Sequence, residues 1–142
     1  MEIPKVVRTY VDAWSAGDLD AWLASFAPDG TYSDPNLPKP TLAHGLKEHF
    51  AGFFAGFPDA TCETVGLDAI SDLLCVWRFV QQGTNTGSLR GLPVTGLKVV
   101  LPGCEFIEIR GGQIRHVQGY FDRLTMLTQL GLAPSSPAKP AT

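Results

Sequence analysis

The spacing of apolar residues changes along the chain, from helical in the first third to strand-like in the remainder. Apolar positions recur at helical spacing over 6–14, and Gly17 ends this helix. Asp18 is expected to cap a second short helix that reaches Phe26. An apolar stripe over 46–54 predicts a third helix. The pattern therefore predicts three helices ahead of the main run of strands.

Period-two alternation dominates from residue 61 onward, with turn residues between the runs. We also expect a short strand over 31–34, followed by a stiff proline-rich loop over 35–40 that is not a strand, a polar glycine-rich connection over 83–93, and a final helix over 124–130. The main expected strands cover 61–67, 73–82, 97–109 (bent at Pro102-Gly103) and 113–121. This order predicts an α+β fold in which helices cover one face of a curved, mostly antiparallel sheet, forming a cone with a hydrophobic pocket.

Length and composition suit a single domain. The chain has 142 residues, of which 44% are hydrophobic and 18% charged, so there is material for an apolar cavity as well as a core. We expect one domain over 1–133. Residues 134–142, which are rich in proline, serine and alanine, are expected to form a flexible tail.

Charge and cysteine content narrow the functional classes. The net charge is −3 and the sequence holds no block of lysine and arginine, which argues against nucleic acid and membrane partners. The N-terminus lacks the apolar segment of a signal peptide. The three scattered cysteines favour free thiols in a reducing cytoplasm, and no histidine or cysteine pair has metal-binding spacing. We expect neither a metal nor a cofactor.

The candidate chemistry lies near the C-terminus, where the last strand ends at Asp122. Strand alternation predicts that Asp122 shares a face with Ile114, His116, Gln118 and Tyr120. A carboxylate among a histidine, an amide and a phenol is a credible acid–base site. Aspartate is also a preferred helix N-cap, so both interpretations stay open on the local sequence.

Several blocks of sequence resemble the SnoaL-like polyketide cyclases of the nuclear transport factor 2-like superfamily. The glycine-rich block resembles their G-T-x-T-G…G-x-P-x-T-G-x-x-V pattern. The resemblance extends over residues 1 to about 133. The blocks that carry it are Gly17-Asp18 with Phe26 to Gly30, Gly83 to Val99, Gly112 to Ile114, Tyr120 to Asp122, and Gln129 to Leu132.

The resemblance implies a conical α+β barrel with a deep hydrophobic pocket, commonly a homodimer packed through the outer sheet face. Such cyclases close a polyketide ring by intramolecular aldol condensation without metal or cofactor, and an aspartate matching Asp122 is their acid–base residue. The related limonene epoxide hydrolases also need an Arg-x-Asp on an earlier strand. Here Arg78-Phe79-Val80 supplies only the arginine.

A second likeness lies nearer the N-terminus. Thr31 to Pro35 is similar to the segment of ketosteroid isomerases whose aspartate, matched by Asp34, is the proton-shuttling base. Tyr10 matches the tyrosine of their oxyanion hole. Glu105 is the nearest candidate for their second oxyanion acid.

The hypothesis is a cyclase or isomerase that performs acid–base chemistry on a hydrophobic, polyketide-like carbonyl compound. Other tailoring reactions, such as epoxide opening or hydroxylation, and non-catalytic ligand binding are the alternatives. Asp34 could instead be a turn residue, and Tyr10 and Trp77 could be core. The candidate catalytic residues are Asp122, His116 and Asp34, and the candidate substrate-binding residues are Tyr10, Tyr32, Asn36, Trp77, Gln118, Tyr120 and Phe121.

Overall fold

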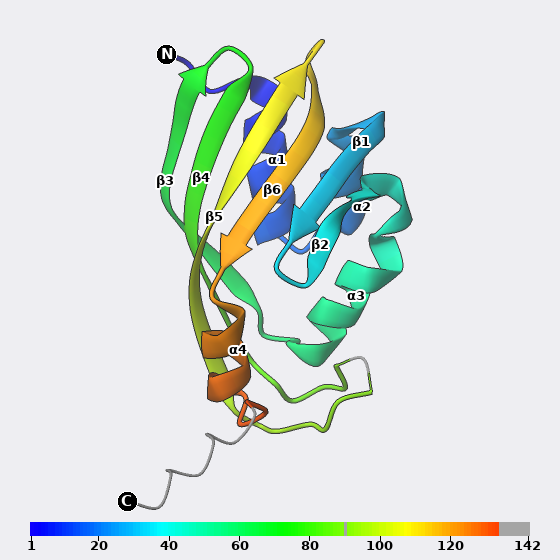
Figure 1. The fold of residues 1–142 in the computed structure, drawn as a ribbon, viewed down its shortest axis with the longest axis vertical. Helices are drawn as coiled ribbons and strands as arrows, with labels where there is room; N and C mark the ends of the chain where they lie inside the picture. The colour runs from blue at the N-terminus through cyan, green and yellow to red at the C-terminus, as the bar shows by residue number, and fades with distance from the viewer. Residues whose placement is uncertain (90, 134–142) are drawn as a thin grey trace, which may run out of the picture.

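The computed structural model describes residues 1–89 and 91–133, and the expected tail over 134–142 lies outside them. The described residues form four α-helices, a short 3-10 helix and one six-stranded sheet (Figure 1). The helices are α1 (Lys5–Ser15), α2 (Leu19–Ala24), α3 (Lys47–Gly56) and α4 (Arg123–Gln129), with η1 (Ala43–Gly45). The strands are β1 (Phe26–Asp34), β2 (Leu37–Leu42), β3 (Thr61–Ser71), β4 (Leu74–Thr84), β5 (Lys98–Arg110) and β6 (Gln113–Phe121).

The sheet has the order β2-β1-β6-β5-β4-β3. All neighbours are antiparallel except β1 and β6, which run parallel. In Figure 1, α1 lies behind the sheet, α2 and α3 lie beside β1 and β2, and α4 follows the end of β6. The predicted α+β class is confirmed, and the curved sheet remains unclosed.

The proline-rich segment differs from its prediction, because Leu37–Leu42 forms strand β2. This strand is at the edge of the sheet and pairs only with β1. Proline lacks a backbone N–H, which an edge strand tolerates on its unpaired side. The second helix is also shorter than predicted, because α2 ends at Ala24 and Phe26 already belongs to β1.

The core lies between α1, α2 and the inner face of the sheet. Tyr10, Trp22 and Trp77 are almost completely buried there and contact one another or Phe26 through their rings. On β5 the inward positions are Val99, Leu101, Gly103, Glu105, Ile107 and Ile109, without the predicted interruption at Pro102-Gly103. Glu105 is thus a carboxyl group in an otherwise apolar row.

The cysteines are free thiols in the structure, as expected. Burial raises the pKa of the Cys62 thiol to about 12, with a further contribution from nearby Glu105. Such thiols are poor nucleophiles at neutral pH because the thiolate is the reactive form. Within residues 1–89 and 91–133, no helix is long and apolar enough to cross a membrane.

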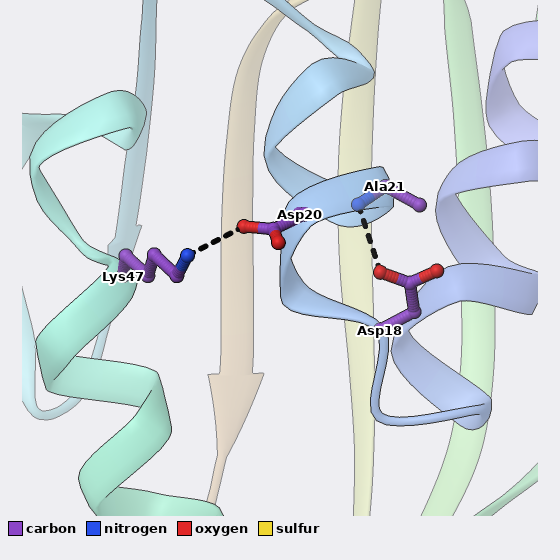
Figure 2. A network of polar contacts seen from close by, with 4 residues as sticks. All are labelled: Asp18, Asp20, Ala21 and Lys47. Atoms are coloured by element: carbon purple, nitrogen blue, oxygen red, sulfur yellow. Dashed lines mark hydrogen bonds and ion pairs between the residues drawn. The ribbon is translucent and has the colours of Figure 1, made fainter.

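Two aspartates position α2, as Figure 2 shows. The Asp18 carboxylate accepts a hydrogen bond from the Ala21 amide at 3.1 Å, which caps the helix as predicted. Asp20 pairs with Lys47 at the start of α3, with an N–O distance of 2.7 Å. Both side chains of this ion pair are largely exposed, so solvent screens the pair.

We predict that Asp18→Ala lowers the free energy of unfolding by about 1 kcal/mol, because the Ala21 amide loses its acceptor. Asp20→Ala is the matched control in the same turn and should change stability much less. Urea unfolding of both variants measures the difference. Equal losses would contradict the assignment of Asp18 as the cap.

Candidate active site

An irregularity in β6 changes which side chains face inward. In the pairing with β5, Ile109 is opposite Ile114 and Glu108 is opposite His116, so Arg115 is an extra residue. A bulge of this kind reverses the alternation beyond it. The expectation that Asp122 shares a face with Ile114, His116, Gln118 and Tyr120 is therefore wrong for Ile114, which lies on the inner face.

The bulge places His116, Gln118 and Tyr120 on the outer face of the sheet. His116 Nδ1 is hydrogen-bonded to Thr31 Oγ1 at 2.8 Å. Gln118 Oε1 accepts a hydrogen bond from Ser33 Oγ. Neither side chain is available to assist a residue in the pocket, contrary to expectation.

Asp122 itself is exposed and caps α4. Its Oδ1 accepts a hydrogen bond from the Thr125 amide at 3.1 Å, and this bond holds the pKa of Asp122 below its usual value. A carboxylate of this kind is a weaker base than an ordinary one. The expected apolar burial of Asp122 is wrong, and the capping interpretation describes its position.

A cavity opens on the inner face of the sheet, between the sheet, α3 and the start of α4. Its walls are mainly apolar and aromatic, and they include two carboxyl groups. The lining residues are Trp14, Tyr32, Asp34, Asn36, His49, Phe50, Phe53, Phe79, Gln81, Leu101, Glu105, Gly119, Tyr120, Phe121 and Met126.

Asp34 is fixed at the end of β1 by three donors. Its Oδ1 accepts hydrogen bonds from the amides of Asn36 and Leu37, at 2.7 and 2.9 Å. Its Oδ2 accepts a hydrogen bond from the Tyr32 hydroxyl at 2.8 Å. Asp34 is 6% exposed, so the carboxylate is held in one orientation with little contact with bulk water.

Glu105 is the second carboxyl group and the more perturbed one. Its Oε1 accepts a hydrogen bond from the Tyr10 hydroxyl at 2.7 Å. Burial raises the pKa of Glu105 to about 7; the charge of Asp34 raises it further, and the Tyr10 hydrogen bond partly opposes the increase. At neutral pH Glu105 can therefore both give and take a proton.

Both tyrosine hydroxyls remain protonated. Burial raises the pKa of Tyr10 and of Tyr32 well above 10, and the charge of Glu105 raises both further. Tyr10 and Tyr32 are thus permanent hydrogen-bond donors, one for each carboxyl group. The resulting site has two carboxyl groups, each bonded to its own tyrosine, in the wall of a mainly apolar cavity.

The other predicted site residues divide between cavity and core. Tyr32, Asp34, Asn36 and Phe121 border the cavity, as expected. Tyr10 lies behind Glu105 and reaches the site only through that carboxyl group.

Two aromatic residues predicted to bind substrate are placed differently. Trp77 is buried in the core, with its indole nitrogen donating to Thr64 Oγ1, so its expected place in the pocket is wrong. Tyr120 borders the cavity, but the residue is 53% exposed and its ring packs on Phe106 at the outer face.

Glu105 was predicted only as the nearest match to the second oxyanion acid of ketosteroid isomerases, and it was not among the candidate site residues. The signal was present in the alternation of β5, where a glutamate occupies an inward position between apolar residues. The expected break at Pro102-Gly103 separated it from Val99 and Leu101 and hid that parity. Among the described residues, no three His, Cys, Asp or Glu side chains gather into a group that could hold a metal ion.

Comparison with known proteins relates the whole domain to a protein family. The chain matches the family model for SnoaL-like polyketide cyclase over residues 4–130. A similar solved structure is IdmH, a candidate polyketide cyclase from Streptomyces antibioticus, with 27% identity, a TM-score of 0.73, and coverage of 89% of this chain and 96% of that one. No curated protein sequence matches.

Two other solved structures share the fold. A candidate polyketide cyclase from Xanthomonas campestris is 26% identical, with a TM-score of 0.72 and coverage of 88% of this chain and 93% of that one. AclR, a candidate hydroxylase from Streptomyces galilaeus, is 21% identical, with a TM-score of 0.78 and coverage of 94% and 83%. At that identity, AclR is evidence for the fold alone.

The pKa of Glu105 generates a prediction about stability. The carboxyl proton of Glu105 is bound more tightly in the folded protein, where its pKa is about 7, than in the unfolded chain, where its pKa is near 4.5. The contribution of this proton to the free energy of unfolding is therefore fully present below pH 4.5, and it is lost as the pH rises through 7. Relative to Glu105→Gln, the free energy of unfolding should fall by on the order of 3 kcal/mol across that window. Denaturant unfolding from pH 4 to 8 measures this, and parallel curves would contradict it.

Proposed function

Because the chain belongs to the SnoaL-like polyketide cyclase family, we propose that it catalyses cofactor-independent proton transfer on a hydrophobic carbonyl compound. Asp34 is the base and Glu105 is the acid. The observation that carries the proposal is that two buried carboxyl groups with different environments border one aromatic-walled cavity. Two carboxyl groups in different environments can take the acid and base roles in one site.

The environments assign the roles. The three donors around Asp34 hold its carboxyl group in one orientation at the cavity, where it is placed to take a proton from a bound substrate. Burial favours the neutral form of Glu105, which can donate one. Because Tyr10 donates to Oε1, the acidic proton of Glu105 belongs on Oε2.

The first step is enolisation. Asp34 removes a proton from the carbon next to the substrate carbonyl, and the electron pair of that C–H bond becomes the carbon–carbon double bond of an enol. The carbonyl oxygen takes the proton of Glu105 at the same time. Asp34 is then neutral and Glu105 is a carboxylate, so charge is conserved.

The second step restores both groups. In ring closure, the enol returns its proton to Glu105 while its carbon attacks a second carbonyl of the same molecule, whose oxygen takes the proton from Asp34. In isomerisation, Asp34 returns its proton to a different carbon of the conjugated enol, while the enol oxygen returns its proton to Glu105 and the carbonyl is reformed. Phe53, Phe79 and Phe121 supply apolar walls that hold the carbon skeleton and limit water.

The alternative of epoxide opening has less support. It would need an arginine near a carboxylate in the cavity, whereas Arg78 is exposed and pairs with Asp68 at 3.6 Å. The homodimer and the cytoplasmic location remain predictions. The exposed Phe106–Tyr120 pair on the outer sheet face is consistent with the former.

We predict that the protein accelerates hydrogen–deuterium exchange at the α-carbon of 2-tetralone, an aromatic bicyclic ketone, as followed by NMR. Asp34→Asn should reduce this exchange by a factor on the order of 10² to 10⁴, because the base is lost. The rate should also decline above pH 7, as Glu105 loses its proton.

The Glu105→Gln variant tests whether Glu105 acts as the acid and not as the base. The amide still donates a hydrogen bond, so a loss of about 10- to 100-fold and the disappearance of the alkaline decline are expected. A loss of exchange in Glu105→Gln as large as that in Asp34→Asn would contradict the assignment of Asp34 as base and Glu105 as acid. Wild-type exchange no faster than buffer would refute the proposed chemistry.

Asp122→Asn tests the alternative that the family resemblance implied. Asparagine is also a good N-cap, so the start of α4 should be preserved. We expect 2-tetralone exchange within about twofold of wild type, because Asp122 is exposed and does not line the cavity. Loss of exchange in a folded Asp122→Asn protein would return the central role to Asp122.

A further inference from the structure

Gly103 lies in the inward row of β5, at the position next to Glu105. Its pairing partners across the sheet are Phe79 on β4 and Phe121 on β6. Both phenylalanines line the cavity. A glycine therefore separates two aromatic residues of the cavity wall, one inward position away from the carboxyl group of Glu105.

The course of the strand does not explain this glycine. Pro102-Gly103 was expected to bend the strand, whereas β5 pairs with both of its neighbours in regular register at this point. Gly103 is also not among the glycines with positive φ, so other residues can adopt its backbone conformation. A glycine inside a strand otherwise marks the close approach of another group.

The group that approaches Gly103 is the ring of Phe79. A Cβ atom on Gly103 would lie 2.8 Å from Phe79 Cε2, 2.9 Å from Phe79 Cζ and 3.1 Å from the backbone oxygen of Tyr120. Non-bonded carbon atoms pack at about 3.5 to 4.0 Å. The outer edge of the Phe79 ring thus lies against the backbone of Gly103, and a larger residue at this position would collide with it.

A methyl group at position 103 would displace the Phe79 ring toward the cavity. On one flank the ring packs against Trp77, with 4.6 Å between the ring centroids, and Trp77 is almost completely buried. The backbone of β5 blocks movement into the sheet. The open side of the ring is the cavity, which Phe79 lines. A displacement on the order of 1 Å, enough to relieve the collision, would therefore take room from a bound ligand.

We infer that Gly103 is a specificity-determining residue, because it lets Phe79 lie against β5 and so leaves room for a fused-ring compound beside Glu105. A single-ring compound does not need this room. That the bound compound is the substrate rests on the proposed function. The contact between Gly103 and Phe79 bears only on which ligands fit.

The test compares the binding of 2-naphthol, which has two fused rings, with that of phenol, which has one ring and the same hydroxyl group. Ligand-observed NMR titration gives both dissociation constants. Gly103→Ala should weaken 2-naphthol binding at least about tenfold, because the displaced Phe79 ring narrows the cavity. Phenol binding should change by less than about threefold. Gly52→Ala is the control variant and should bind both ligands as wild type does, since a Cβ there meets nothing within 4 Å.

A double variant separates displacement of the ring from damage to the strand. Phe79→Leu removes Cε2 and Cζ, the two ring atoms that the new methyl group would meet. The Gly103→Ala/Phe79→Leu protein should therefore bind 2-naphthol within about threefold of Phe79→Leu alone. A tenfold loss that persists in the Phe79→Leu background would overturn the inference.

A third measurement does not depend on the folding of Gly103→Ala. Phe79→Leu alone enlarges the cavity, so it should shift relative affinity at least about fivefold from 2-naphthol toward the three-ring compound 2-hydroxyanthracene. An unchanged affinity ratio would overturn the inference. Wild-type 2-naphthol affinity in Gly103→Ala, equal weakening of 2-naphthol and phenol, or no binding of 2-naphthol by wild type would also overturn it.

The two proposals can fail separately. If wild-type protein does not exchange 2-tetralone but Gly103→Ala selectively loses 2-naphthol, the size determinant stands and the proposed reaction is wrong. If exchange occurs and Gly103→Ala still binds 2-naphthol normally, the reaction stands and the role of Gly103 is wrong.

Discussion

The hydrogen bond between the Tyr10 hydroxyl and Glu105 Oε1 is the constraint on which the site depends. It joins residues 95 positions apart and connects α1 to the middle of β5. A buried carboxyl group without a partner would be costly, and a fully ionised one costlier still. Tyr10 removes part of that cost while leaving the pKa of Glu105 raised to about 7. The fold thus keeps an acid inside an apolar cavity in a form that exchanges protons at neutral pH.

The sheet brings the second carboxyl group to the same cavity. The parallel pairing of β1 and β6 places Asp34 one strand beyond Gly119, while the antiparallel pairing of β6 and β5 places Glu105 on the other side. Neither residue is near the other in sequence. The chemistry therefore depends on strand register, and a shift of one residue would turn either carboxyl group out of the cavity.

The sequence predicted most elements because their periodicity is strong. Resemblance to ketosteroid isomerases pointed to Asp34, which borders the cavity, and to Tyr10, which lies behind Glu105. The sequence prediction failed for β2, where edge pairing tolerates the prolines, and for Asp122, where a single extra residue at Arg115 reverses the alternation. Bulges have no strong sequence signature, so counting by two along β6 gave a regular but incorrect face.

The most direct test of the account is a carbon-13 NMR titration of the Glu105 side-chain carboxyl group, assigned by comparison with Glu105→Gln. We expect a transition with a midpoint near 7, as for an acid buried in the cavity. A midpoint near the ordinary value of 4.5 would show that Glu105 is a solvated carboxylate at neutral pH, and would contradict the assignment of acid and base.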